Sequence, residues 1–165
     1  MRTKIQNKTA SAEIESLGAQ LMSLKNAEGT EYLWQGDPAF WSSRAPVLFP
    51  TVGNVRGGTT IINGKPYALK RHGFARNLEH SVLDSGANFI AYSLKDSEET
   101  RKLYPFVFEL RVTYRLIENG LTTEFAVFNR GDEELPFGIG GHPGFRCPLV
   151  PGERFEDYRI LFEKE

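Results

Sequence analysis

Two of the three histidines lie beside glycine in short segments. His72 belongs to the segment RHGFAR (71–76), and His142 belongs to the segment GIGGHPGF (138–145). Glycine lets the backbone approach a ligand closely, and Pro143 restricts the backbone of the residue before it. Because imidazole can donate or accept a proton near neutral pH, both segments are candidates for acid–base chemistry in a cleft. The alternative is a histidine that is hydrogen-bonded at a turn for structural reasons.

Four arginines lie near Gly- or Pro-rich turns, where a guanidinium group can fork onto hydroxyls or a phosphate. They are Arg44, Arg56, Arg71 and Arg76. A solvated surface arginine is the alternative for each of them. Several aromatic residues are crowded upstream of these turns. We expect Trp34 and Phe49 to be core residues, whereas Trp41 stays open between the core and contact with a sugar ring.

The sequence offers no pattern for a metal or a cofactor. Zinc needs three or four ligands, and the only cysteine, Cys147, stands between an arginine and a proline. The pair Gly57-Gly58 lacks the strand-to-helix context of a phosphate loop or dinucleotide fingerprint. We therefore expect neither metal nor cofactor.

The elements that would position these residues are strands, because apolar residues recur mostly at every second position. One hairpin is expected over residues 12–25, and another at 59–69 across Asn63-Gly64, a sequence that favours a two-residue turn. Further strands are expected at 81–85, 89–95, 106–117 and 121–129 in an antiparallel meander, with only residues 96–103 helical in character. The pattern predicts an all-β chain whose strands are antiparallel.

The C-terminal segment also alternates, with Tyr158, Ile160 and Phe162 on one side, which predicts a strand in progress at the end of the sequence. A sheet left incomplete at its C-terminal end would have unpaired edges, and unpaired edges favour self-association.

Composition bounds the remaining possibilities. The 165 residues are 40% hydrophobic and 25% charged with a net charge of −1, which is typical of one globular domain spanning 1–165. No global charge favours nucleic acid, and no apolar run is long enough to cross a membrane. The single cysteine and the charged N-terminal stretch indicate a cytoplasmic protein.

Several segments together resemble the galactose mutarotase (aldose 1-epimerase) superfamily, in its lactose-operon X-protein-like branch. They are LWQGDP (33–38) with FW (40–41), APVLFP (45–50) with VG (52–53), HGFAR (72–76) and GHPGF (141–145). They follow the family's order, and the resemblance covers essentially the whole sequence. It implies the N-terminal portion of a large antiparallel supersandwich with a sugar cleft on one face.

The resemblance also implies roles for individual residues. His142 would be the general acid that protonates the sugar ring oxygen, and His72 would hydrogen-bond and orient the substrate. Arg76 matches the family's arginine in HGFAR, Arg71 precedes the same motif, and Arg44 is a weaker match for an upstream arginine, with Arg56 as a third option. The family's catalytic glutamate has no counterpart in 1–165.

The expected function is interconversion of the α and β anomers of an aldose or aldose phosphate, in a chain that is itself doubtful as a catalyst. The partner would be a monosaccharide or a sugar phosphate. A non-catalytic carbohydrate-binding module is the rival interpretation, and association with another chain through sheet edges is a third.

Overall fold

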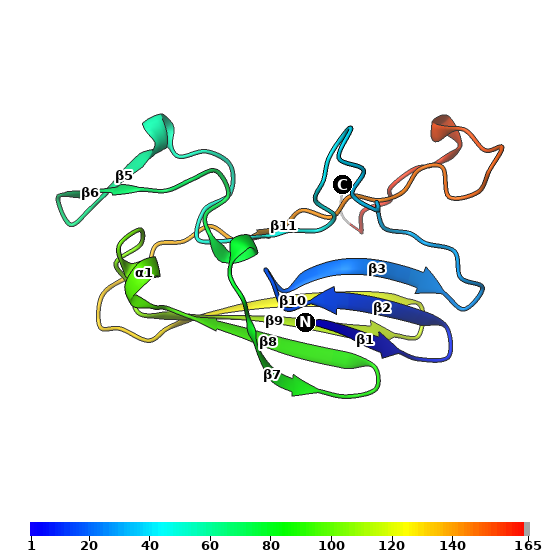
Figure 1. Cartoon of the computed structure of the whole chain (residues 1–165), viewed down its shortest axis with the longest axis horizontal. Helices are drawn as coiled ribbons and strands as arrows, with labels where there is room; N and C mark the ends of the chain where they lie inside the picture. Colours follow the sequence, from blue (N-terminus) through cyan, green and yellow to red (C-terminus); the bar gives the residue numbers. More distant parts are fainter. Residues whose placement is uncertain (164–165) are drawn as a thin grey trace.

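The computed structural model describes residues 1–163, and most of its regular structure is strand (Figure 1). The strands are β1 (Arg2–Gln6), β2 (Ala10–Glu15), β3 (Gln20–Asn26), β4 (Val47–Leu48), β5 (Thr59–Ile62), β6 (Lys65–Ala68), β7 (Ser81–Ser85), β8 (Phe89–Lys95), β9 (Phe108–Ile117), β10 (Gly120–Asn129) and β11 (Gly140–Gly141). The helical elements are short: α1 (Glu98–Arg101), and the 3-10 turns η1 (Arg56–Gly58), η2 (Ala75–Asn77) and η3 (Phe155–Asp157).

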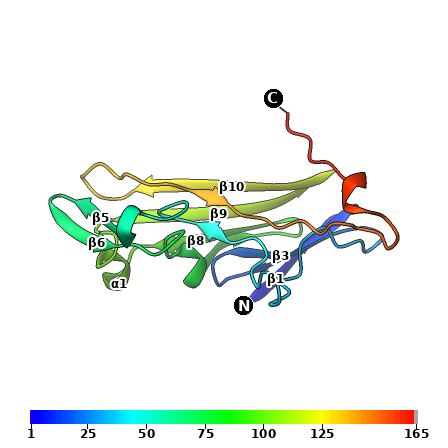
Figure 2. The same ribbon diagram turned by 90° about the horizontal axis from the view of Figure 1, so that it is seen from above.

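Two antiparallel sheets pack against each other. One has the order β1-β2-β3 and the other the order β10-β9-β8-β7 (Figures 1 and 2). Two small two-stranded sheets, β4 with β11 and β5 with β6, complete the topology. The β5–β6 hairpin and the segment around η3 project at opposite ends of the molecule in both views.

The core lies between the two large sheets because their strands alternate. On β9, Leu110, Val112 and Tyr114 are at most 3% exposed and face the other sheet, where Ile5 and Ile14 are at most 1% exposed. Burial of each such side chain contributes about 1.5–3 kcal/mol before the cost of ordering the chain.

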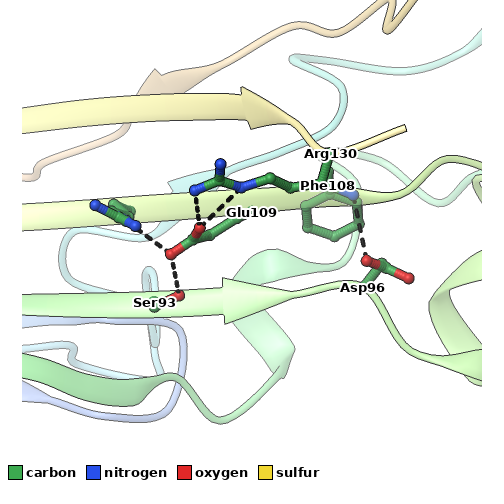
Figure 3. A network of polar contacts seen from close by, with 6 residues as sticks. Ser93, Asp96, Phe108, Glu109 and Arg130 are labelled. Carbon is green, nitrogen blue, oxygen red and sulfur yellow. Dashed lines mark hydrogen bonds and ion pairs between the residues drawn. The ribbon is translucent and has the colours of Figure 1, made fainter. Parts of the chain in front are cut away.

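A buried carboxylate stands on the opposite face of β9. Glu109 is 3% exposed and accepts hydrogen bonds from Ser93, Arg111 and Arg130, at 3.0 Å, 2.7 Å and, for the shorter Arg130 contact, 2.6 Å (Figure 3). The two arginines hold the pKa of this carboxyl at about 2. Their guanidinium carbons also lie 4.5 and 4.7 Å from the ring centroid of Phe128, so the network joins β8, β9 and β10.

The structure confirms the all-β antiparallel fold and its meander. The turns at Asn63-Gly64 and Glu118-Asn119 join β5 to β6 and β9 to β10, and β7 and β8 span the expected residues. Residues 96–103 contain only the four-residue α1, capped by Ser97.

The strand expected at 158–162 is wrong. These residues follow η3, pair with no other strand, and leave Ile160 and Phe162 at 69% and 82% exposed. Alternation makes a segment suitable for a strand, but a strand also needs a neighbour to take up its backbone hydrogen bonds.

No helix within residues 1–163 has the length and apolar character needed to span a bilayer.

Candidate active site

One segment, residues 44–53, contacts both histidine loops through its backbone. On one side, β4 pairs with β11, with Val47 opposite Gly141 and Leu48 opposite Gly140. The His142 N–H continues this pairing by donating to the Pro46 carbonyl at 3.1 Å. The loop that carries His142 is therefore fixed to the segment by its backbone.

The other side of the same segment holds the His72 loop. Phe49 forms a parallel bridge with Gly73, and its carbonyl accepts the N–H groups of Phe74 and Ala75 at 3.0 and 3.2 Å. A Cβ atom on Gly73, whose φ is +69°, would lie 2.2 Å from the Phe49 carbonyl oxygen. Only glycine fits this position, because both the conformation and the close approach exclude a side chain.

Phe49 anchors the whole arrangement in the core. Its side chain is fully buried, with ring centroids 5.1 Å from Phe108 on β9, 6.3 Å from Phe74 and 6.0 Å from Tyr104. The aromatic cluster connects the site to the larger sheet, so the two histidine loops rest on a packed base rather than on each other alone.

The two imidazoles face one cleft. Their ring centroids lie 5.9 Å apart, and the ring of Trp41 lies 5.3 Å from that of His142. The cleft has a volume of about 420 Å³ and is lined by Trp41, Pro46, Leu48, Arg71, His72, Arg76 and His142. This lining places both predicted histidines and two of the predicted arginines at one site.

His72 is the more restrained of the two histidines. It is 9% exposed with a φ of +66°, a left-handed conformation that is uncommon for a residue with a side chain. The Gly53 N–H points at its Nδ1 and the Arg71 Nε at its Nε2, each at 3.0 Å. Burial, followed by the charges of Arg71 and Arg76 and by His142, lowers the pKa of this imidazole.

The side chain of one cleft arginine, Arg76, contacts the backbone of the other, Arg71. An Nη of Arg76 donates to the Arg71 carbonyl at 3.1 Å, and the buried Nε of Arg76 has no hydrogen-bond partner among the described residues. No carboxylate belongs to the lining within residues 1–163. The cleft is therefore cationic and rich in donors, which suits a ligand that presents oxygen atoms.

Arg44 and Arg56 are not brought to this cleft. The Arg44 guanidinium donates to the Met22 carbonyl at 2.6 Å and to Gln35 Oε1 at 2.9 Å, which ties β3 to the loop after it. Arg56 starts the exposed η1 turn. Trp41, which the sequence left open, is in the lining, and the apolar Pro46 and Leu48 were not expected there. No three His, Cys, Asp or Glu side chains gather as potential metal ligands within residues 1–163.

The layered antiparallel sheets and a cleft with two facing histidines define a mutarotase-like β-sandwich protein, and comparisons confirm it. A solved galactose mutarotase related enzyme from Lactobacillus acidophilus superposes with a TM-score of 0.92 at 45% identity, over 95% of this chain and 53% of that one. A galactose mutarotase-like protein from Lactobacillus casei gives 0.87 at 36%, over 92% of this chain and 52% of that one.

The sequence matches the aldose 1-epimerase family over residues 1–164, so the chain belongs to that family. It is also 39% identical over 170 residues to the chromosomal protein LacX of Lactococcus lactis subsp. lactis, covering 99% of this chain and 57% of LacX. The chain thus spans little more than half the length of these relatives.

Proposed function

We propose that these residues form the sugar-binding and acid-donating part of an aldose 1-epimerase, which interconverts the α and β anomers of an aldose or aldose phosphate. The observation that carries the proposal is the pair of imidazoles, 5.9 Å apart, over a cleft with two guanidinium groups. Family membership supports the reaction class.

The reaction needs two proton transfers. A base removes the proton of the anomeric hydroxyl, an acid delivers a proton to the ring oxygen, and the bond between that oxygen and the anomeric carbon breaks to give the open aldehyde. Rotation and reclosure on the other face complete the inversion. The protons balance without a metal or a redox cofactor. In this proposal His142 is the acid, while His72, Arg71 and Arg76 bind and orient the sugar oxygens.

The base is assigned to the part of the relatives that this chain does not span. The cleft lining within residues 1–163 offers imidazole and guanidinium groups but no carboxylate. Guanidinium groups keep their protons and cannot act as a base, and this proposal gives both imidazoles other roles, so the chain alone supplies only half of the required pair.

A chimera tests this function. Residues 1–163 are fused to the part of the Lactobacillus acidophilus relative that the chain does not match, and mutarotation is followed by polarimetry on freshly dissolved α-glucose and α-galactose and, with a coupled assay, on a hexose phosphate. We expect the chimera to accelerate the change of optical rotation in proportion to its concentration. A folded chimera with no effect on any of these sugars would contradict the proposal.

A non-catalytic carbohydrate-binding module is the second candidate, favoured by Trp41, whose ring lies beside His142 at the cleft. An aromatic face can stack on a sugar without any chemistry. This function predicts that Trp41→Ala abolishes sugar binding, measured by calorimetry, and that the chimera binds sugar but leaves the rate of mutarotation at the buffer level.

Self-association through β10 is proposed as a further property of the chain. The backbone N–H of Leu116 on β9 donates to the Asn88 carbonyl, which lies on the side of β8. Leu116 therefore points its backbone groups away from β10, and it forms no backbone hydrogen bond with Leu121, the β10 residue opposite it. Backbone groups at alternate β10 residues, including Thr123 and Phe125, therefore face away from β9. This ten-residue edge has a regular register with β9 and contains no Lys or Pro that would block pairing.

We also propose a cytoplasmic location for the protein, supported by its single cysteine.

A further inference from the structure

Both ring nitrogens of His72 face N–H donors. The Gly53 backbone nitrogen lies 3.0 Å from Nδ1, and the Arg71 Nε lies 3.0 Å from Nε2. A neutral imidazole has one N–H and one acceptor nitrogen, and arginine keeps its protons in proteins. His72 therefore cannot accept a hydrogen bond from both groups at once, and one of the two contacts must yield.

The Gly53 contact is the fixed one. The backbone N–H of His72 donates in return to the Gly53 carbonyl at 2.9 Å, so two hydrogen bonds hold these residues together. The bridge between Phe49 and Gly73 holds the next residue of the loop as well. By contrast, the Arg71 side chain is exposed and forms no ion pair within residues 1–163. Arg71 can move without disturbing the fold.

We propose that His72 is held with its proton on Nε2, and that His72 Nε2–H and Arg71 Nε–H form a two-donor site for a single acceptor oxygen of the ligand. The two donors repel when nothing lies between them. An oxygen that enters from the cleft, with Arg71 turned slightly outward, accepts from both and removes that repulsion.

This assignment makes His72 a positioning residue that donates a hydrogen bond. Its protonated form is disfavoured by burial and by the charges of Arg71 and Arg76, which lower its pKa, so the imidazole stays neutral while it donates. The identity of the oxygen as part of a sugar rests on the proposed function. The protonation state of the ring nitrogens does not, because it is set by Gly53 within this chain.

The first measurement uses the 165-residue chain with ¹⁵N-labelled histidine and no ligand. Long-range ¹H–¹⁵N spectra at slightly alkaline pH distinguish a protonated, pyrrole-type nitrogen from an unprotonated, pyridine-type one. We expect the His72 Nδ1 to be pyridine-type and Nε2 to be pyrrole-type. The reverse pattern, or an even mixture of the two, would overturn the proposal whether or not the chimera has activity.

The second measurement tests the paired donors with two probes, inorganic phosphate and glucose, titrated to their solubility limits. At least one probe should shift the His72 Nε2 and Arg71 Nε resonances together. Arg71→Ala should lower the affinity for that probe about tenfold or more, the order expected for loss of a charged hydrogen bond. Arg71→Lys should restore part of the affinity.

Arg115→Ala is the matched control, since it removes an exposed cation that lies over Phe89 on another part of the molecule. It should leave binding of the probe unchanged. Equal affinity of the wild-type chain and Arg71→Ala, or no shift at Nε2 with either probe, would exclude the two-donor site. An amide spectrum of each variant establishes that the fold is retained.

Discussion

The two histidines of the cleft differ in their surroundings although each lies next to a glycine in the sequence. His72 is buried, left-handed and clamped by Gly53, whereas His142 is exposed and fixed only through its backbone and the neighbouring Trp41 ring. A proton donor must exchange protons with solvent between turnovers, and an orienting group must hold still. The environments therefore favour His142 as the acid and His72 as the positioning group.

His142→Asn should lower the turnover number of the chimera about a hundredfold or more, because asparagine keeps a polar contact but cannot deliver a proton. The Michaelis constant should change far less. Steady-state polarimetry gives both values, and His72→Asn is the comparison, for which we expect a rise in the Michaelis constant at least as large as the loss of turnover. A near-normal turnover number in His142→Asn would remove the acid assignment.

The buried Glu109 carboxylate predicts a stability effect at acid pH. Its folded-state pKa of about 2 lies below the value of about 4.3 expected in the unfolded chain, so its contribution is fully present above about pH 5 and is lost as pH falls toward 2. Glu109→Gln should cost about 1–2 kcal/mol at pH 7, since its arginine partners are partly solvated. Urea unfolding against pH measures this.

The control for that measurement is Glu124→Gln on β10, which removes an exposed carboxylate on the same sheet. It should leave the free energy of unfolding within about 0.5 kcal/mol of the wild-type value. If Glu109→Gln unfolds at the wild-type urea concentration across the whole range, the ion network of Figure 3 does not stabilise the sheet.

His80 predicts a second change with pH, nearer neutrality. It is 3% exposed, its Nδ1 lies 3.0 Å from the Leu78 carbonyl, and its buried Nε2 has no partner among the described residues. Burial lowers its pKa in the folded state, so the unfolded chain binds the proton more readily. Stability is complete above the unfolded value of about 6.5 and falls as pH drops below it.

Urea midpoints between pH 8 and pH 5, chosen to bracket the unfolded pKa of about 6.5, test this prediction. His80→Gln should reduce the loss of stability between pH 8 and pH 5. The same pair of measurements in a chain that also carries His72→Asn separates the contribution of His72, whose pKa is lowered in the same direction. An identical pH dependence in His80→Gln and the wild-type chain would show that His80 is not responsible.

Among the elements, hairpins were predictable from sequence because their information is local. Asn63-Gly64 and Glu118-Asn119-Gly120 specify turns, and the alternating residues on either side specify which face is buried. The strand β1 was missed because it is short and places only Ile5 fully in the core. The strand predicted at 158–162 was wrong because its apolar residues alternate but no neighbouring strand pairs with it.

The site was only partly predictable for the same reason. Its histidines could be found from their glycines, but β4 and β11 contribute two residues each and meet across a long stretch of sequence, which no local pattern records. Whether Arg44 or Arg71 reaches the cleft depends on side-chain partners such as Met22 and Gln35 that only the folded chain brings near.

Proline substitutions on β10 should affect self-association differently, according to whether the backbone N–H that is lost faces the free edge or faces β9. Thr123→Pro removes an N–H that faces the free edge, and it should shift the chain toward monomer with little loss of stability. Thr122→Pro is the matched variant, because Thr122 and Arg115 form a hydrogen-bonded pair within the sheet. Proline at this position removes a hydrogen bond of the sheet, so Thr122→Pro should lower the free energy of unfolding by about 1–3 kcal/mol.

Sedimentation velocity at several concentrations, together with urea unfolding, distinguishes the two proline variants. Wild-type chain should form dimers or larger species as concentration rises, and Thr123→Pro should not. Association that is unchanged in Thr123→Pro would place the contact elsewhere on the molecule, for example at the exposed Phe155 or Phe162.

At the scale of the whole molecule, the chain has a packed core and a formed cleft, yet it spans 57% of LacX and 53% of the solved Lactobacillus acidophilus relative. The two histidine loops are fixed by Phe49 and by β4, all within residues 1–163. The chain should therefore bind a ligand without catalysing the reaction, because the imidazole and guanidinium groups proposed to contact a ligand are present, while the cleft lining within residues 1–163 includes no carboxylate.

The 165-residue chain is accordingly expected to bind a sugar or sugar phosphate weakly and to leave mutarotation at the buffer rate. As the proposed acid, His142 would deliver a proton to the ring oxygen, but ring opening also needs a base at the anomeric hydroxyl. Losing general base catalysis alone removes roughly a hundredfold or more of the rate. Polarimetry on fresh α-glucose, with calorimetry on the same preparation, measures both properties. The chimera provides the positive control, and its His142→Asn variant provides the background. Acceleration by the chain alone, in proportion to its concentration and lost in His142→Asn, would mean that a group within these residues serves as the base.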